Sequence, residues 1–478
     1  MDVSPAWRRD EPAPPVRVVH LGLGAFARAH LLTYTQDAGA DLPPAQRWGV
    51  AGFTGRSARA AHDLASQDGR YTLVERGVDG DRTRVVDALV EVHDGADATR
   101  WRALLARPEV AVLTLTVTEA GYRRTSTGAL DRRDAQVRDD AALLGRYVAD
   151  GDAGGTARAA TTAPGRVLDG LRARRAAGGG TLAVVSLDNL PDNGDALRRV
   201  VLELAEDVDH DLAGWVRTHV AFVSSMVDRI TPATTDADRT AVRDATGRQD
   251  AAPVVTEPFR EWVLSGRFPA GRPAWDVAGA RFVADLAPYE HRKLWLLNAG
   301  HSLLAYAGLP RGARTVAEAY ADPVVRTRLE ELWREAREVL PLTGGELDDA
   351  LADLRSRFAN ARIEHRLEQI ARDGSQKLPV RVLAVARTRR DAGLPVGPAG
   401  AGVLADWAQH LRDSVGVAGD EAHPDLAAAH LADRLRDADP DTAAAFVVAA
   451  LAPDLADDRT FVATVAGAVA ARHALTPS

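Results

Sequence analysis

Short apolar runs and amphipathic segments alternate through the first 284 residues. Residues 16–22, Val-Arg-Val-Val-His-Leu-Gly, have the length and composition of a buried strand. Similar apolar runs predict further strands at residues 48–53, 110–117, 181–187 and 220–224. Amphipathic patterns predict helices at residues 25–38, 56–66 and 167–177, and a Gly/Ala/Thr-rich stretch predicts a loop at 151–165. Alternating strands and helices are typical of a parallel sheet, so residues 1–284 are expected to form an α/β domain.

The pattern changes after about residue 284, where strand signals nearly disappear. Apolar residues then recur at helical spacing, which predicts helices at residues 289–308, 316–339, 347–357, 362–373, 401–414 and onward to the end. Residues 285–478 are therefore expected to form a second, mostly α-helical domain. A chain of 478 residues is long enough for two domains that each bury a core.

Composition narrows the classes of function. The net charge of −8, from 59 basic and 67 acidic residues, argues against nucleic acid or an anionic membrane as the main partner. The absence of cysteine excludes disulfides, a cysteine nucleophile and a cysteine-ligated zinc site. Residues 1–15 have no apolar core of signal-peptide length, and the apolar run 443–453 is too short to span a bilayer. We expect a soluble, cytoplasmic protein.

A few residue types are unusually rare in this chain. Of its 59 basic residues only Lys293 and Lys377 are lysine, and Asn, Ile and Met are also scarce. These types share A/T-rich codons, so a GC-biased genome is the simplest explanation. A lysine that must lose and regain a proton cannot be replaced by arginine, because arginine stays charged. The surviving lysines and asparagines are therefore candidates for function, with chance survival as the alternative for any single one.

Two glycines directly follow the first predicted strand. Gly22 and Gly24 begin the pattern Gly-x-Gly-x-x-Ala, which ends at Ala27. Such a turn lets a dinucleotide pyrophosphate approach the backbone, although a plain tight turn has the same pattern. A carboxylate is expected at the end of the second strand, but the sequence there is Gly-Arg56-Ser57. Arg56 would suit the 2′-phosphate of NADP, or it is an exposed residue at a helix start.

The segment 289–301 combines groups that suit alcohol oxidation. At about 100° per residue of an α-helix, Asn298 lies about 140° and His301 about 80° from Lys293, so all three can border one cleft. A desolvated lysine can act as a base, an amide can donate to a developing alkoxide, and a histidine can donate to a neighbouring hydroxyl. The alternative is a structural helix with a capped lysine and a satisfied histidine.

Polar segments follow two other predicted strands. Residues 186–194 contain Asp188 and Asn189, and residues 225–232 contain Asp228. The carboxyl edge of an α/β sheet is where such sheets bind ligands. Asp, Asn, Pro and Gly are also ordinary turn residues, so a pair of turns is the alternative.

Taken together, the motifs resemble those of a known family, the polyol-specific long-chain dehydrogenases or mannitol dehydrogenase family, which includes mannitol 2-dehydrogenase and fructuronate reductase. The resemblance runs from His20 to about Phe461. The motifs that carry it are the glycine turn with Arg28-Ala-His30 and the segments 116–122, 188–194, 226–232, 257–262, 271–275, 293–301 and 373–379. The resemblance implies a Rossmann-type N-terminal domain, a mostly helical C-terminal domain and an active site between them.

The resemblance also implies a catalytic set. Lys293 would be the general base in oxidation and the general acid in reduction. Asn189 and Asn298 would form the oxyanion hole around the reacting oxygen. His301 would hold a substrate hydroxyl, and Asp228 would help to position the lysine. No metal is implied.

Further residues are candidates for binding. By resemblance Lys377 would bind the substrate chain and Glu290 matches a position near the proton path, while Arg381 is a candidate contact for a carboxylate. The expected coenzyme is NAD, with NADP left open by Arg56 in place of the family's acidic residues, and the candidate contacts are Gly22, Gly24, Phe26, Arg56, Thr116 and Glu119. The chain also departs from the family at Ala27, where His is usual, and at Leu187, where Cys is usual.

We expect the substrate to be a linear polyol or a sugar acid. Gln369 and the segment 376–381 look closer to the fructuronate reductase branch, while tagaturonate and mannitol-1-phosphate types are alternatives within the family. A sensor that binds a dinucleotide without turnover is the non-enzyme alternative, but it predicts a broken catalytic set. A methyltransferase could use the glycine turn, but it would not need Lys293 with both asparagines. A monomer would suffice, and a small homo-oligomer is equally compatible.

Overall fold

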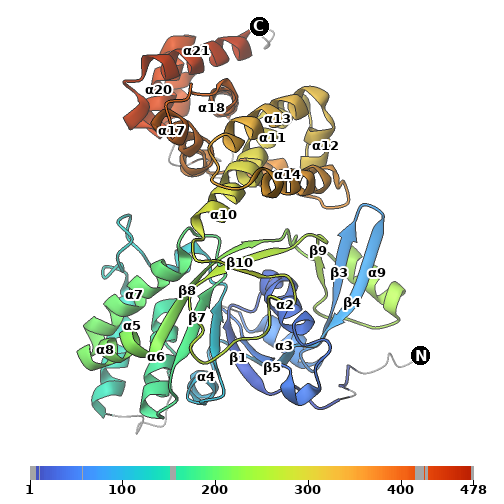
Figure 1. Ribbon diagram of the computed structural model, residues 1–478, viewed down its shortest axis with the longest axis vertical. Coiled ribbons are helices and arrows are strands. Elements are labelled where there is room, and N and C mark those ends of the chain that lie inside the picture. The colour runs from blue at the N-terminus through green and yellow to red at the C-terminus, as the bar shows by residue number, and fades with distance from the viewer. Residues whose placement is uncertain are drawn as a thin grey trace. The chain divides into compact units, whose positions relative to one another are not determined.

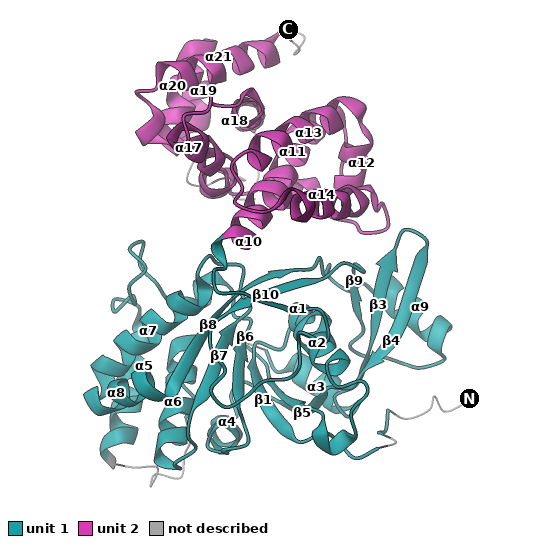
Figure 2. Cartoon of the chain, viewed as in Figure 1, with its two compact units in different colours: residues 1–287 teal, residues 288–478 magenta. Residues whose placement is uncertain are grey.

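The computed structural model describes residues 7–9, 11–55, 57–150, 158–414, 425 and 429–474. The chain divides into two compact units, Met1–Ala287 (unit 1) and Pro288–Ser478 (unit 2), drawn in teal and magenta in Figure 2. Figure 1 shows that unit 1 combines strands with helices and that unit 2 is helical. The expected order, an α/β part followed by a helical part, is confirmed.

The main sheet of unit 1 contains eight of the described strands. They are β1 (Val16–Leu21), β2 (Gly49–Phe53), β5 (Leu89–His93), β6 (Val112–Leu115), β7 (Leu182–Ser186), β8 (Val220–Asp228), β10 (Glu261–Ser265) and β11 (Arg281–Phe282). Their order is β11-β10-β8-β7-β6-β1-β2-β5, and the six strands from β8 to β5 are parallel. Because the chain order reverses between β1 and β6, the edge beyond their carboxyl ends is where this topology binds ligands.

Helices flank this sheet as the apolar strand sequences require. Neighbouring residues of β1 enter different cores on the two faces of the sheet: Val19 packs with Leu104 and Val167, and Val18 packs with Leu31. Strands buried on both faces must be apolar throughout, which is why β1, β2, β6 and β7 were recognisable. The helices of unit 1 are α1 (Ala25–Ala29), α2 (Leu31–Asp37), α3 (Arg59–Ala65), α4 (Ala98–Leu105), α5 (Ala135–Asp150), α6 (Ala163–Ala176), α7 (Asn193–Val208), α8 (His210–His219) and α9 (Asp236–Thr246), with η1 (Pro44–Gln46) and η2 (Glu119–Tyr122) as 3₁₀ turns.

A second, smaller sheet in unit 1 was not predicted. It consists of β3 (Tyr71–Gly77), β4 (Gly80–Val86) and β9 (Val254–Thr256), in the order β4-β3-β9. The first four residues of β4 are exposed, so its sequence lacks an apolar run. β3 pairs in parallel with β9, which lies far along the chain. β3 also pairs over its whole length with the adjacent β4, so it is the short β9 whose partner is distant and whose local signal is weak.

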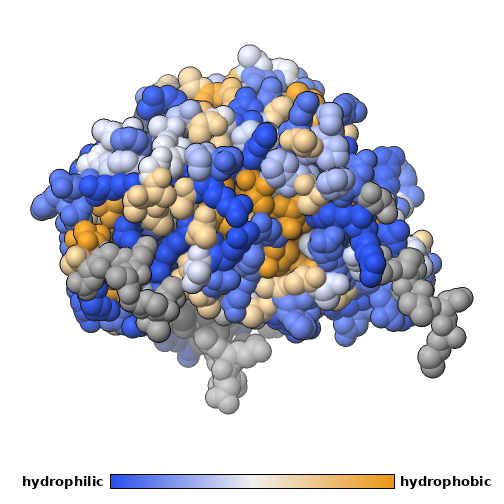
Figure 3. Space-filling model, turned by 90° about the horizontal axis from the view of Figure 1, so that it is seen from below, coloured by the Kyte–Doolittle hydropathy of each residue, from blue (hydrophilic) through white to orange (hydrophobic). Residues whose placement is uncertain are grey.

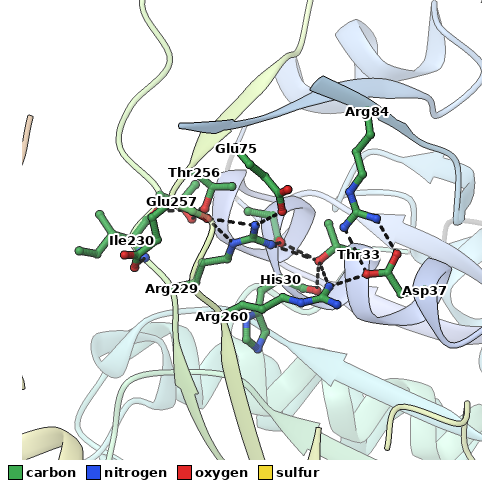
Figure 4. A network of polar contacts seen from close by, with 12 residues as sticks. His30, Thr33, Asp37, Glu75, Arg84, Arg229, Ile230, Thr256, Glu257 and Arg260 are labelled. Carbon is green, nitrogen blue, oxygen red and sulfur yellow. Dashed lines mark hydrogen bonds and ion pairs between the residues drawn. The ribbon is translucent and has the colours of Figure 1, made fainter. Parts of the chain in front are cut away.

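The single helix predicted at residues 25–38 is two helices, α1 and α2, that meet at His30. The carbonyl of Ala29 accepts a hydrogen bond from Arg229 Nη1 at 2.5 Å (Figure 4), and from Thr33 Oγ1 at 2.8 Å. Donors from outside the backbone pattern disturb a helix at the carbonyl that they bind. The His30 ring is fully buried among Phe26, Tyr34 and Trp262.

Unit 2 consists of helices around one apolar core. Its α-helices are α10 (Ala287–Arg292), α11 (Ala299–Gly308), α12 (Val316–Ala321), α13 (Pro323–Arg337), α14 (Gly344–Ala359), α15 (Leu367–Ala371), α16 (Gly374–Leu378), α17 (Ala384–Asp391), α18 (Pro398–Asp413), α19 (Ala429–Leu435), α20 (Pro440–Leu451) and α21 (Arg459–His473). Two further segments, η3 (Lys293–Asn298) and η5 (Pro379–Leu383), are π-helices, and η4 (Leu309–Arg311) and η7 (Pro453–Leu455) are 3₁₀ turns.

Two long helices expected in unit 2 are interrupted. The pattern at 316–339 is divided at Asp322, whose carboxylate accepts from the backbone N–H groups of Val324 and Val325 and so caps α13. Pro323 is the first residue of that helix, a position that suits proline. Of the pattern at 362–373, only α15 is helical.

Apolar residues lie in the helices and also on the surface. In the part of the chain that the structure describes, no helix has both the length and the apolar composition needed to cross a bilayer. The face drawn in Figure 3 is mostly hydrophilic, with one group of hydrophobic residues near its centre. Apolar surface of that kind is normal in folded proteins, so it does not mark a site by itself.

Candidate active site

The turn after β1 requires glycine at its first position. Gly22 has a φ of +102°, and a Cβ on it would overlap the backbone carbonyl of Thr116. The backbone N–H groups of Gly22 and Leu23 both donate to the carbonyl of Phe53, at 2.9 and 3.0 Å. The turn is therefore held at the carboxyl ends of β1, β2 and β6. Gly24, which precedes α1, is exposed and has only ordinary van der Waals contact where a Cβ would be.

Side chains of β1 and of the end of β6 form a chain of hydrogen bonds that reaches this turn. Thr116 Oγ1 donates to the carbonyl of Gly22 at 2.7 Å and lies 3.2 Å from His20 Nε2. His20 Nδ1 lies 2.8 Å from Thr114 Oγ1. Because the Thr116 hydroxyl has one hydrogen and gives it to Gly22, His20 Nε2 is the donor in their contact. Burial of the His20 ring lowers its pKa to about 4.

The buried His20 predicts a loss of stability in acid. Its pKa is lowered from 6.5 to about 4 on folding, so between these values the unfolded state binds more protons and stability falls as the pH falls. Each pKa unit corresponds to about 1.4 kcal/mol. Between pH 6.5 and pH 4.5, the free energy of unfolding should fall by about 2 kcal/mol less in a His20→Asn variant than in the wild type. Urea titrations at both pH values measure this, and equal losses in the two proteins would contradict it.

Asp188 joins the ends of β6 and β7. Its Oδ1 accepts from the backbone N–H groups of Val117 and Thr118, both at 2.8 Å, and its Oδ2 accepts from Tyr122 Oη at 3.0 Å. Thr118 has a φ of +68°, which is strained for a β-branched residue. Burial raises the pKa of Asp188, and these hydrogen bonds act in the opposite direction. The carboxylate therefore holds the strained segment that contains Thr116 and Glu119.

Replacing Asp188 with alanine is expected to destabilise unit 1 by about 2–4 kcal/mol, because two amide donors lose their shared acceptor. Asp188→Asn keeps a side-chain oxygen that can accept both N–H groups, so it serves as the matched control and should cost much less. Chemical denaturation of the two variants measures the difference. Equal stability of Asp188→Ala and the wild type would show that the carboxylate does not support this segment.

The predicted coenzyme contacts differ in their surroundings. Phe26 is half-buried, with its ring stacked on that of His30 at 5.1 Å between centroids. Glu119 is exposed at the start of η2, three residues after Thr116 on the same segment. Arg56 lies outside the described residues. The described residues that flank it at the end of β2, Thr54, Gly55 and Ser57, include no carboxylate.

Asn189 and Asp228 come after β7 and at the end of β8 respectively, two neighbouring parallel strands. Asn189 is exposed and Asp228 is buried. Arg229, the next residue, is wholly buried and pairs with Glu75 Oε1 at 2.7 Å and with the carbonyl of Glu257 (Figure 4). Since Arg229 also binds the helix that follows the glycine turn, the β8 end and that turn are fixed together.

In unit 2, the segment that carries Lys293 is not an α-helix. Lys293 to Asn298 form the π-helix η3, in which the N–H of the following residue, Ala299, donates to the carbonyl of Leu294 five positions back. The angles assumed from the sequence are therefore wrong here. Residues five apart in a π-helix are joined by one hydrogen-bonded turn, so Lys293 and Asn298 face more nearly the same side of the segment than the roughly 140° of an α-helix would allow.

His301 lies one turn further along and is buried in its neutral form. Burial is the largest cause that holds its pKa well below 6.5, and the nearby His365, Arg357 and Arg381 add to it. Its ring meets that of His365 edge-on at 4.7 Å between centroids. His301 Nε2 is buried with no hydrogen-bond partner among the described residues. A neutral imidazole with a free nitrogen can donate to or accept from a hydroxyl.

Lys377 and Arg381 are adjacent in space but make different contacts. Lys377 Nζ donates to the carbonyls of Arg372 at 2.5 Å and Ile370 at 3.3 Å, which end the preceding helix α15. Burial, with Arg381 nearby, lowers the pKa of Lys377. Arg381 Nη1 donates to the carbonyl of Asn298 at 3.3 Å and to Ser302 Oγ at 3.2 Å. Of the two basic groups, Arg381 thus binds the end of the segment that carries Asn298.

Comparison with known proteins identifies the chain. Residues 16–277 match the model of the mannitol dehydrogenase Rossmann domain, and residues 285–472 match that of the mannitol dehydrogenase C-terminal domain. The chain belongs to the mannitol dehydrogenase family. The family membership, the Rossmann-type and helical domains and the enzyme class, a dehydrogenase, are therefore confirmed.

Named members of the mannitol dehydrogenase family cover most of the chain. D-mannonate oxidoreductase of Escherichia coli is 34% identical over 88% of this chain and 85% of its own length. Mannitol 2-dehydrogenase of Cereibacter sphaeroides is 37% identical over 79% of this chain and 77% of its own length. The solved ternary complex of Pseudomonas fluorescens mannitol 2-dehydrogenase with NAD and D-mannitol is 32% identical in sequence and has a TM-score of 0.79. The match covers 96% of this chain and 92% of that chain.

The geometry of this family member adds supporting residues that the sequence did not reveal. Asp188 belongs to one of the family motifs, but its role depends on contacts with Val117, Thr118 and Tyr122, more than 60 residues earlier in the chain. No local sequence pattern marks His365, which packs against His301, or Trp333, which donates to the carbonyl of Leu296 in η3 at 2.9 Å. Glu290, in contrast, was named, and it is buried in α10 just before Lys293. Among the described residues there is no cluster of three or more His, Asp or Glu side chains that could hold a metal ion.

Proposed function

We propose that the protein is an NAD-dependent dehydrogenase that interconverts a secondary alcohol of a linear polyol or sugar acid and the corresponding ketone, without a metal. The observation that supports this proposal is the π register of η3, which turns Lys293 and Asn298 toward the same side of the segment, one turn before the buried, neutral His301. This combination provides a base, an amide donor and a hydroxyl-binding imidazole within one helical segment.

In oxidation, Lys293 takes the proton of the reacting hydroxyl as the hydride leaves its carbon. Asn298 and Asn189 donate hydrogen bonds to the oxygen as it becomes an alkoxide and then a carbonyl, which is the charge that amide donors stabilise. His301 holds a neighbouring hydroxyl, and Asp228 helps to position the lysine. Reduction reverses these steps, with Lys293 as the acid. A positioned acid or base contributes about 10²- to 10⁴-fold to the rate.

Unit 1 is proposed to bind the coenzyme, which supplies the hydride acceptor when bound. The turn at Gly22 and Gly24 offers the close backbone approach that a pyrophosphate needs. Phe26 follows the turn in α1, Thr116 donates to the carbonyl of Gly22, and Glu119 lies three residues after Thr116. NAD is favoured because a solved relative binds it, and Arg56 keeps NADP as the alternative.

The substrate chain is proposed to extend past His301 toward Lys377 and Arg381, with Glu290 near the path of the proton. Several basic groups lie near His301, since Arg357, Arg381 and His365 all lower its pKa. Such surroundings accept hydroxyl groups and are also compatible with a terminal carboxylate. The proposed substrate class therefore includes both polyols and sugar acids.

A coenzyme screen tests this proposal. NADH and NADPH are each mixed with the protein and with fructose, fructuronate or tagaturonate, and absorbance at 340 nm is followed. We expect oxidation of NADH with at least one of the three. NADH binding without oxidation by any ketose or keto acid would contradict the proposal and favour a dinucleotide sensor.

A further inference from the structure

Two π-helices occur side by side in unit 2. η3 carries Lys293 and Asn298, and η5 carries Arg381, and the two segments pack against each other. π-helices account for well under 1% of residues in proteins and often occur at functional sites. Two in contact, each at candidate site residues, therefore need a structural cause.

The sequence of η3 does not supply that cause. Lys-Leu-Trp-Leu-Leu-Asn contains neither Gly nor Pro, and leucine and lysine are good α-helix formers. An ordinary α-helix continues on both sides of it, in α10 and α11. The α register is thus the default for this segment, and in that register Asn298 would turn away from Lys293.

Side-chain donors from elsewhere in unit 2 bind the carbonyls of η3. Trp333 Nε1, on α13, donates to the carbonyl of Leu296 at 2.9 Å, and both residues are fully buried. Arg381 Nη1, on η5, donates to the carbonyl of Asn298 at 3.3 Å and to Ser302 Oγ. A donor that enters the hydrogen-bond ladder of a helix changes its local geometry.

We propose that Trp333 and Arg381 are positioning residues that stabilise the π register of residues 293–298 and so align Lys293 with Asn298. Trp333 is the principal one, because its donor is buried against the middle of the segment. Without it, the carbonyl of Leu296 loses a partner in the core, and the α register becomes the better alternative. This inference rests on the proposed function only for its catalytic consequence.

Trp333→Phe tests the proposal, because phenylalanine keeps most of the ring and removes the N–H donor. Trp407→Phe is the matched control, since Trp407 is equally buried in the same core and its Nε1 has no partner among the described residues. A misplacement of about 1 Å can cost about 10²-fold in rate, so we expect Trp333→Phe to lower kcat by about 10- to 100-fold. The KM for NADH should stay within about two-fold of the wild-type value. General destabilisation would not lower kcat while leaving this KM unchanged. Trp407→Phe should keep kcat within about two-fold.

Hydrogen exchange gives a readout that does not need turnover. Amides of residues 293–299 should exchange faster in Trp333→Phe than in the wild type, and at the wild-type rate in Trp407→Phe. Unchanged exchange and unchanged kcat in Trp333→Phe would overturn the proposal, as would equal effects of the two substitutions. If the wild type itself turned over no substrate, the proposed function would fail, and hydrogen exchange alone would still decide this inference.

Discussion

Replacing Lys293 with alanine is expected to lower turnover by about 10²- to 10⁴-fold, the usual contribution of a positioned acid or base. The KM and Kd for NADH should hardly change, because the proposed coenzyme contacts lie in unit 1 and Lys293 lies in unit 2. Steady-state kinetics and a fluorescence titration with NADH measure the two quantities separately.

The chain provides its own control for this substitution, since Lys377 is its other lysine. Lys377 Nζ binds the carbonyls that end α15 and is proposed to contact the far end of the substrate. Lys377→Ala should raise KM for the sugar much more than it lowers kcat. Near-normal kcat in Lys293→Ala, or the larger kcat loss in Lys377→Ala, would show that the base has been assigned to the wrong residue.

Replacing Gly22 with alanine is expected to cost about 3 kcal/mol or more of stability and to abolish NADH binding. The new Cβ would overlap a backbone carbonyl that cannot move without displacing β6, and the φ of +102° is strained for alanine. Thermal unfolding and NADH titration measure the two effects.

Gly24→Ala separates stability from binding. A Cβ at Gly24 would meet only the carbonyl of Gly22, at 3.7 Å, so the fold should tolerate it. The pyrophosphate is proposed to approach the backbone at this position, and NADH affinity should therefore still fall. If Gly22→Ala kept wild-type stability, the description of the turn would be wrong; if Gly24→Ala kept full affinity, the coenzyme would lie elsewhere.

The sequence predicted those parts of the fold whose signals are local. β1, β2, β6 and β7 are buried on both faces and so consist of apolar runs. The small sheet was missed because β4 is half exposed and the three-residue β9 has its partner β3 far away in the chain. The break at His30 was missed because a buried arginine about 200 residues away binds the carbonyl next to it.

The candidate site shows the same division. Lys293 and Asn298 could be named from their rarity and from the resemblance of their motif. Their geometry could not, because periodicity assumes an α-helix, whereas donors on α13 and η5 bind the carbonyls of this segment. Likewise, no local pattern brings His365 to His301 or Asp188 to the Thr118 backbone. The sequence was enough to predict which residues belong to the candidate site, but not the tertiary contacts that position them and shift their pKa values.

Transfer of deuterium from labelled NADH tests the proposed reaction at the level of the bond that forms. The protein, treated with EDTA and dialysed, is incubated with NADH deuterated at C4 and with each ketose or keto acid, and the products are analysed by mass spectrometry. We expect deuterium on the carbon that was the carbonyl in at least one product, and far less of it with Lys293→Ala. No transfer to any of them, or transfer only after a metal is added back, would contradict a metal-independent dehydrogenase that uses Lys293.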